Sequence, residues 1–249
     1  MKLKVLLSVL LFLSVVPASY AGGDRLFLSL TPSLHGGVIG ITDASRSSLT
    51  YNGPLAGAGL YLSACRKTVD LYLDADYSYG WLRNIYHNNS ESTFNHLIDL
   101  SIGGMTGICD NNRVSMKVGC ALGGLGNAFV NRRIDRCFHM LTIDAKACVS
   151  TRLKLPRKAS FLIEDRIPLL AFMVAFNKTD IPLLDPDYAF KAFPGNDCKA
   201  KVCQQLRDGR SLMLVIRCCS YSSGRALPNS FQIQFLELGL ALRFGLAVY

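Results

Sequence analysis

Apolar and polar residues alternate along three long segments of the chain, 69–81, 141–155 and 236–248. In the first segment the odd positions are all apolar or aromatic, whereas the even positions include three aspartates. A period of two predicts a β-strand that has one apolar and one polar face. The three segments keep this period for 13 to 15 residues, whereas a strand of a soluble protein usually has about 5–6 residues. Strands of this length are expected in a wall that crosses a membrane at a tilt.

Six further segments follow the same pattern less regularly and raise the number of predicted strands to nine. They are 26–37, 56–65, 94–108, 114–128, 161–176 and 212–221. Asp165 departs from the pattern, because it falls among the apolar positions of its segment unless a β-bulge shifts the phase. A closed bacterial barrel has an even number of strands, so a tenth strand is expected. The dipeptide Asp208–Gly209 predicts a hairpin turn, and segment 199–206 directly before it is the candidate for the missing strand.

The predicted fold is therefore all-β: a closed, antiparallel, up-and-down β-barrel of about ten strands that spans a membrane. Closure is required because an unpaired backbone N–H or C=O group costs several kcal/mol in hydrocarbon, so no sheet edge can remain open. An eight-stranded barrel is the alternative, if segment 199–206 and one neighbouring segment belong to loops.

Short and long connections alternate along the chain, as expected for an up-and-down barrel. Short turns are predicted at 67–68, 110–112 and 156–158, and long loops at 86–92, 131–137 and 176–197. If the short turns face the periplasm, both ends of the chain lie there as well. Segment 176–198 contains three prolines, and long outward loops often carry function. We expect it to contact a ligand, a host surface or a neighbouring protein, unless it is only a tolerated insertion.

The first 21 residues have the layout of a secretory signal peptide. A basic start precedes an apolar run from 5 to 16, and Ser19 and Ala21 form a small-residue cleavage site. Such an apolar run is too short for a transmembrane anchor. We therefore expect residues 1–21 to be removed on export and residues 22–249 to form the barrel domain.

The composition supports an exported membrane protein. Half of the residues are hydrophobic, only 18% are charged, and the mean hydropathy is +0.25. These values argue against a disordered chain and against a nucleic-acid-binding scaffold. Beyond position 20 no apolar stretch reaches the about 18 residues that a membrane-spanning helix needs, so strands must account for the apolar character. The net charge is +9 and falls to +7 without the two lysines of the signal peptide, so the mature protein is mildly basic.

Aromatic residues collect near the predicted outer end of neighbouring strands. Tyr77, Tyr79 and Trp81 close one strand and Phe94 opens the next, so all four lie at a similar height on the apolar face. A band of aromatic side chains at the membrane–water interface is typical of transmembrane barrels. The four residues are therefore predicted to belong to an aromatic girdle, with the core cluster of a soluble β-sandwich as the alternative.

The strand pattern, together with a C-terminal segment 243–249 that ends in an aromatic residue, resembles the small bacterial outer-membrane β-barrels of the OmpA, OmpX and OmpW kind. Tyr249 departs from that family in phase, because it does not share the apolar face of Phe244. The resemblance implies an outer-membrane protein that contacts membrane lipids and lipopolysaccharide and is inserted by the barrel-assembly machinery. We expect a monomer that binds no nucleic acid and no cofactor.

If the apolar faces meet lipid, the polar faces point into the lumen and carry charges of both signs in equal number. The predicted lumen charge network consists of Asp74, Asp76, Asp99, Lys117, Asp144, Lys146, Arg152, Glu164, Arg166, Arg217, Glu237 and Arg243. A ring of one sign would indicate an ion-selective pore, whereas six cations and six carboxylates suggest paired charges. A small barrel is just wide enough for its own side chains. We therefore expect a filled lumen, with a narrow channel for small or apolar solutes as the alternative.

Catalytic and metal-binding residues are not expected. An outer-membrane hydrolase or acyltransferase would need a histidine near a nucleophile or an acid at the outer rim. His87 and His139 lie near that rim, with Ser90, Ser92 and Asp135 as candidate partners, but no family signature surrounds them. A lipid-modifying enzyme is therefore only the second alternative, and we expect a structural or surface-interaction role. No C-x-x-C motif or matched Cys/His pair indicates a metal site.

Nine cysteines are unusual for such a barrel. The periplasm and the cell exterior allow disulfides to form, and an odd number leaves at least one thiol free. Cys198 and Cys203 are the candidate disulfide, while Cys137 and the adjacent Cys218 and Cys219 are further candidates for pairing.

Overall fold

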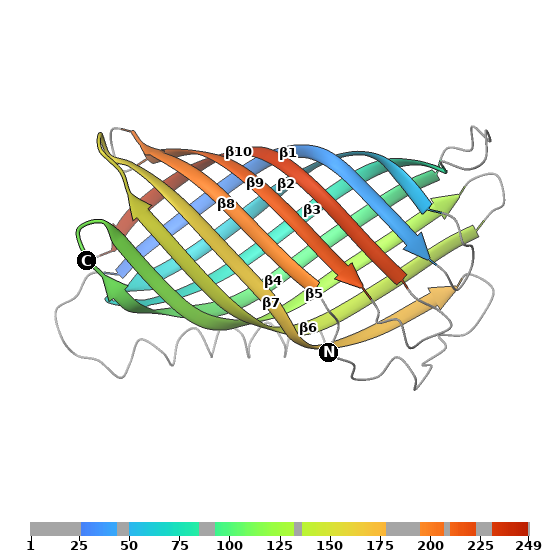
Figure 1. Ribbon diagram of the computed structural model, residues 1–249, viewed down its shortest axis with the longest axis horizontal. Helices are drawn as coiled ribbons and strands as arrows, with labels where there is room; N and C mark the ends of the chain where they lie inside the picture. Colours follow the sequence, from blue (N-terminus) through green and yellow to red (C-terminus); the bar gives the residue numbers. More distant parts are fainter. Residues whose placement is uncertain are drawn as a thin grey trace.

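The computed structural model is a closed antiparallel β-barrel of ten strands (Figure 1), which confirms the predicted fold class. The structure describes residues 26–43, 50–84, 93–131, 136–177, 195–206, 210–222 and 231–248. The strands are β1 (Leu26–Asp43), β2 (Thr50–Arg66), β3 (Val69–Asn84), β4 (Thr93–Asp110), β5 (Val114–Asn131), β6 (Arg136–Lys154), β7 (Ala159–Asn177), β8 (Gly195–Gln205), β9 (Arg210–Ser222) and β10 (Phe231–Val248). The predicted signal peptide, residues 1–21, lies outside the described residues.

Consecutive strands pair with each other around the whole barrel, and β10 closes it by pairing with β1. At one end of this closing seam Leu26 lies opposite Val248, and at the other end Asp43 lies opposite Phe231. Every strand therefore has two hydrogen-bonded neighbours, as hydrocarbon requires. The candidate segment 199–206 forms most of β8, which is the shortest strand. The eight-stranded alternative is wrong.

Short turns connect the strands where β1 begins and β10 ends, which we call the short-turn end. They lie at 67–68, 111–113 and 155–158, within one residue of the predicted positions. Lys67 has a φ of 54°, and Arg157 and Lys158 both have a φ of 59°. Left-handed values of this kind belong to the tight turns whose twist matches that of a β-hairpin.

The opposite end of the barrel is the long-loop end, where the connections 44–49, 85–92, 132–135, 178–194 and 223–230 lie outside the described residues. The strands reach further in this direction than the alternation predicts. β6 begins at Arg136 and β8 at Gly195. Residues at the edges of the predicted loops 131–137 and 176–197 therefore belong to strands. The prediction that segment 176–198 contacts a partner concerns residues that are mostly outside the described part.

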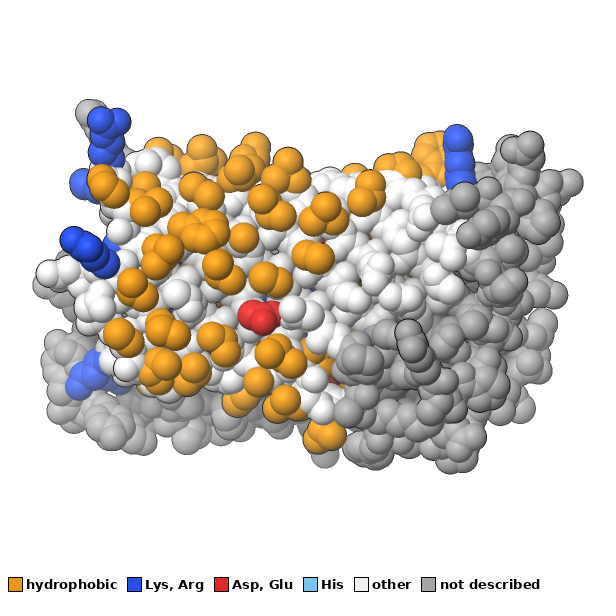
Figure 2. Space-filling view, viewed as in Figure 1, with side chains coloured by type: hydrophobic (Ala, Val, Ile, Leu, Met, Phe, Trp, Pro, Cys, Tyr) orange, Lys and Arg blue, Asp and Glu red, His pale blue; other side chains and the backbone are white. Residues whose placement is uncertain are grey.

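The apolar faces of the strands form the outer wall of the barrel, and Figure 2 shows hydrophobic side chains spread over that wall. Leu238 and Ile143 have 56% and 50% of their surface exposed, whereas Asp144, the neighbour of Ile143, has 3%. A soluble sandwich would show the inverse arrangement, with its leucines buried and its aspartates in water. Within the described ranges no helix is long and apolar enough to span a bilayer.

Asp165 places a carboxylate on this outer wall. It lies between Ile163 and Ile167, both of which are exposed. The pairing of β6 with β7 contains a bulge at Leu169, which has no partner in the register. Because the bulge follows Asp165 along β7, it does not turn Asp165 inward. The departure from alternation is therefore real and leaves an acid among lipid-facing positions.

Replacing Asp165 with leucine is expected to raise the free energy of unfolding in lipid by about 1 kcal/mol, because acidic side chains on the lipid face of a barrel are unfavourable, though less so than basic ones. Urea titration in lipid vesicles, followed by the fluorescence of the single tryptophan, measures the change. Asp110→Leu is the matched control, since Asp110 lies exposed at the short-turn end in an ion pair with Lys154 and such pairs contribute little. Lower stability of the Asp165 variant would contradict the assignment of its side chain to the lipid face.

Candidate functional site

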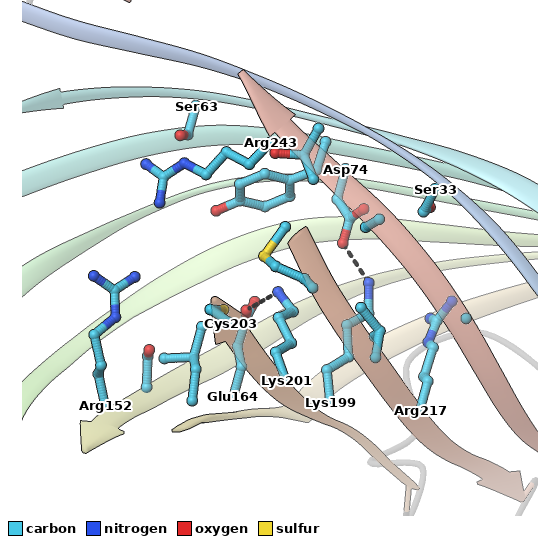
Figure 3. Close-up of a pocket in the computed structure, with 18 of the residues that line it drawn as sticks. Ser33, Ser63, Asp74, Arg152, Glu164, Lys199, Lys201, Cys203, Arg217 and Arg243 are labelled. Carbon is cyan, nitrogen blue, oxygen red and sulfur yellow. Dashed lines mark hydrogen bonds and ion pairs between the residues drawn. The ribbon is translucent and has the colours of Figure 1, made fainter. Parts of the chain in front are cut away.

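The inward-facing side chains divide the lumen into three parts along its length. The part toward the long-loop end contains buried apolar side chains, which we call the apolar layer. The middle contains buried charged side chains, which we call the ion-pair layer. The part toward the short-turn end, together with the adjoining ion-pair layer, encloses a cavity of about 150 Å³ (Figure 3).

The apolar layer draws side chains from eight of the ten strands. Its members are Ile39, Ile41, Leu55, Leu82, Leu97, Leu125, Ala171, Cys219, Tyr221, Ile233 and Phe235. The alternation pattern did not reveal this layer, because it assigned inward positions by their polarity. A signal was nevertheless present, since β1 and β10 are apolar on both faces toward the long-loop end: the buried Ile39 follows the exposed Val38, and the buried Phe235 precedes the exposed Leu236.

Arg217 on β9 is the centre of the ion-pair layer. Its Nε and Nη2 donate to the two carboxylate oxygens of Asp197 over 2.8 and 2.9 Å, and Nη2 also donates to Asp99 across the lumen. Its guanidinium lies over the ring of Phe235, 5.0 Å from the ring centroid. Arg217 therefore joins the ion-pair layer to the apolar layer.

A second group of charges lies beside it and links β3, β7 and β8. Arg166 contacts Glu164 and Asp74, with nitrogen–oxygen distances of 2.5 and 2.8 Å. Lys199 donates to Asp74 over 2.5 Å, and Lys201 donates to Glu164 over 2.9 Å. Each carboxylate thus has two cationic partners, which offsets part of the cost of burying it. Figure 3 shows the two lysine contacts.

All twelve side chains of the predicted charge network lie in the lumen. Lys146 lies 3.5 Å from Asp144, and Lys117 pairs with Asp70 near the short-turn end. Arg152 and Arg243 line the cavity, but neither forms a hydrogen bond or an ion pair with another described side chain. The network is therefore paired in the middle of the barrel, whereas toward the short-turn end one ion pair lies beside two arginines that have no partner among the described side chains.

Four further acidic or basic residues of the lumen and one histidine were not predicted: Asp70, Asp197, Lys199, Lys201 and His35. Three of them lie on β8, whose weak apolar face concealed the alternation of its polar positions. His35 shares the inward face of β1 with small hydroxyl residues, so this face carries little charge. The inward position of His35 could have been predicted from the regular alternation of leucines on the other face of β1.

His35, Asp76 and Glu237 come together at the edge of the cavity, where one ligand atom of each lies within 4.8 Å of the others. Three potential ligands for a metal ion therefore meet in the described part of the lumen, although no metal site was expected from the sequence. The sequence spacing could not show this, because the three residues belong to β1, β3 and β10 and are joined only by the barrel register.

The predicted disulfide between Cys198 and Cys203 is wrong. Both residues lie on β8, and the rise of a strand places Cα atoms five residues apart at about 16 Å, far beyond the about 7 Å that a disulfide can span. Both thiols are free. The register instead places Cys198 opposite Cys218 on β9. The side chain of Cys137 lies outside the described part.

The four residues of the predicted girdle lie together on the outer wall. Trp81 is opposite Phe94 in the register of β3 with β4, and their rings stack with centroids 5.8 Å apart. Tyr79 stacks on Phe94 at 5.7 Å. Tyr77 hydrogen-bonds through its hydroxyl group to Nδ1 of His96, over 2.9 Å. The cluster lies toward the long-loop end.

The candidate catalytic residues fall outside the described structure. This holds for His87, Ser90, Ser92 and Asp135, and for the side chain of His139, whose backbone belongs to β6. Whether they meet at the outer rim stays a prediction.

No protein-family model matches the sequence, and no curated protein is significantly similar to it. Among solved structures, the outer membrane protease OmpT from Escherichia coli has 3% sequence identity and a TM-score of 0.54, and the match covers 92% of this chain and 98% of OmpT. The translocator domain of the autotransporter NalP from Neisseria meningitidis has 9% identity and a TM-score of 0.41, with 93% and 92% covered. Neisserial surface protein A has 12% identity and a TM-score of 0.35, with 87% and 95% covered.

At 3% identity the OmpT match shows the fold alone. It does not single out the OmpA, OmpX and OmpW barrels that the sequence pattern resembles. Taken with the ten-stranded closure, the apolar outer wall and the charged lumen, it identifies the class: this chain is a closed β-barrel of the bacterial outer-membrane type.

Proposed function

We propose that this protein is an exported, monomeric outer-membrane barrel with a sealed lumen, and that its role is structural or one of surface interaction rather than conduction. The observation that carries the proposal is the apolar layer, in which eleven buried side chains pack together in the lumen toward the long-loop end. A hydrophobic constriction excludes water and therefore ions. Behind it, the ion-pair layer places cations and carboxylates in direct contact across the lumen.

The proposed orientation puts the short-turn end in the periplasm and the long-loop end outside the cell, as in other outer-membrane barrels. The exposed leucines and isoleucines of the wall then meet lipid acyl chains, and the aromatic cluster around Trp81 lies at the outer interface, near lipopolysaccharide. Insertion by the barrel-assembly machinery belongs to the same proposal. A lipid-modifying enzyme at the outer rim stays the second alternative.

Reconstitution of the purified barrel into planar bilayers tests the proposal. We expect no discrete conductance steps at voltages under which a general porin in the same bilayer conducts, because the apolar layer leaves no wet path. Fractionation of outer membranes, together with a folded band that shifts on heating in gel electrophoresis, checks the location and the fold of the same sample. Discrete openings from folded protein would contradict the sealed lumen and favour the channel alternative.

A further inference from the structure

We propose that the lumen contains a binding site for one divalent transition-metal ion of the Zn²⁺ type, formed by His35, Asp76 and Glu237. The three side chains come from β1, β3 and β10 and meet at the edge of the cavity. Nε2 of His35 lies 3.1 Å from Oδ1 of Asp76 and 3.5 Å from Oε1 of Glu237. The proposed metal site does not depend on whether the apolar layer seals the lumen.

The distances from His35 to the two carboxylates fit a metal ion, and all three ligand atoms lie within 4.8 Å of one another. Nitrogen and oxygen ligands lie about 2.0–2.2 Å from Zn²⁺, so neighbouring ligands of a tetrahedral or octahedral ion are separated by about 3.0–3.5 Å. Both distances from His35 fall in this range. Three protein ligands leave at least one coordination position for water, and the cavity beside them provides room for it.

Two glycines on the intervening strand β2 keep the space between these ligands open. A Cβ atom at Gly57 would lie 2.2 Å from Nε2 of His35 and 2.6 Å from Oγ of Ser78. A Cβ atom at Gly59 would lie 2.8 Å from Oδ2 of Asp76. Both glycines are on β2, which separates β1 from β3. Only without side chains at these positions can His35 reach across β2 to Asp76.

The charges of the ion-pair layer leave a deficit of positive charge. Its members are the carboxylates Asp74, Asp76, Asp99, Asp144, Glu164, Asp197 and Glu237 and the cations Lys146, Arg166, Lys199, Lys201 and Arg217. Within this layer seven negative and five positive charges leave an excess of two negative charges, whereas Lys117, Arg152, Arg243 and Asp70 toward the short-turn end bring the described lumen to eight charges of each sign. The imbalance is local to the layer, and a divalent cation bound there would neutralise it.

The two proposed carboxylate ligands have only long contacts with the cations of this layer. Arg217 directs its short contacts to Asp99 and Asp197, and its Nη1 lies 3.9 Å from Asp76 and 4.0 Å from Glu237. Asp76 and Glu237 therefore contact Arg217 only at Nη1, and its other nitrogens already donate to Asp99 and Asp197. His35 is the remaining group close to both.

The arrangement suits a metal ion better than nucleophilic catalysis. Nε2 of His35 is also 2.8 Å from Oγ of Ser78, but a serine–histidine–acid triad uses the two different ring nitrogens for its serine and its acid. Here one nitrogen faces serine and both acids. Imidazole with two carboxylates is a donor set for Zn²⁺ and related divalent ions, whereas Ca²⁺ and Mg²⁺ prefer oxygen alone and Cu⁺ prefers sulfur.

The test uses the mature full-length barrel, folded in detergent micelles and stripped of metal with a chelator. Equilibrium dialysis against Zn²⁺ with elemental analysis is expected to give one ion per barrel. Co²⁺ in its place is expected to give the visible absorption of a histidine–carboxylate site. His35→Gln should weaken Zn²⁺ binding at least tenfold and remove the Co²⁺ absorption. His96→Gln is the matched control, because His96 lies on the outer face against Tyr77 and its loss should leave Zn²⁺ binding unchanged.

A second variant separates loss of the site from loss of the fold. Gly59→Ala keeps all three ligands but directs a methyl group at the flexible end of Asp76, so we expect a barrel that still shifts on heating in a gel and binds Zn²⁺ at least tenfold more weakly. Wild-type protein that binds less than one ion would overturn the proposal. Equal Zn²⁺ binding by wild type and a folded His35→Gln variant would overturn it too, and would leave His35 as an ion-pair partner of the two carboxylates.

Discussion

Replacing Arg217 with methionine is expected to lower the free energy of unfolding by about 3–5 kcal/mol, the range for removing one partner of a buried ion pair. Arg217 donates hydrogen bonds to Asp99 and Asp197 and faces two further carboxylates. Methionine restores part of the volume against Phe235 but none of the charge. The variant therefore leaves carboxylates buried without a cation. Urea titration of the barrel in lipid vesicles measures the loss.

Two further variants separate the effect of charge from that of side-chain size. Arg152→Met is the matched control, because Arg152 also points into the lumen but makes no ion pair with another described residue; its stability should change by less than about 1 kcal/mol. Adding Asp99→Asn and Asp197→Asn to Arg217→Met should recover most of the loss, since neutral amides need no cation. Equal losses for Arg152→Met and Arg217→Met would contradict the central position of Arg217.

The strands and their closure could be predicted from the sequence because a lipid-facing wall imposes a strict period of two. Leucines and isoleucines must alternate with inward residues over the full width of the bilayer, so even β8 is recoverable from the need for an even number of strands. The same logic placed Asp144 in the lumen and Ile143 on the wall. Asp165 shows the limit of this pattern, because a single acid can lie on the outer wall in a strand whose other residues alternate as predicted.

The apolar layer was hidden because alternation measures a difference between two faces. Where Ile39 and Phe235 fill the lumen, the inward face is as apolar as the wall, and the period of two disappears. The predicted segments are shorter than β1 and β10 for the same reason, since segment 26–37 ends before Ile39 and segment 236–248 begins after Phe235. A continuous apolar stretch inside a predicted barrel strand is therefore evidence of a filled lumen rather than of a loop.

Residue clusters such as His35 with Asp76 and Glu237 depend on register, which the sequence did not supply. The three positions are far apart in the chain and share a height in the barrel only because β1 pairs with both β2 and β10 in fixed alignment. The missing register also explains why the disulfide was predicted between the wrong cysteines. Nearness in sequence favoured Cys203 as the partner of Cys198, whereas the register places Cys218 there.

Replacing Leu238 with arginine is expected to lower the free energy of unfolding in lipid by about 2–4 kcal/mol, the cost of a basic side chain on the lipid face near the bilayer midplane. Leu238 is exposed on the outer wall and lies near the middle of β10. The arginine has no carboxylate beside it, because its register neighbours on the wall are Gly36 and Ile216. Urea titration in vesicles gives the change in lipid.

Depth in the membrane decides the control for this experiment. Leu155 is also exposed, but it lies in a turn at the short-turn end, where the cost of arginine falls to about 0–1 kcal/mol. A large loss for Leu238→Arg beside a small loss for Leu155→Arg requires hydrocarbon around the middle of the wall. Similar small losses for both would mean that water surrounds Leu238, and the apolar wall would then need a protein partner rather than a membrane to cover it.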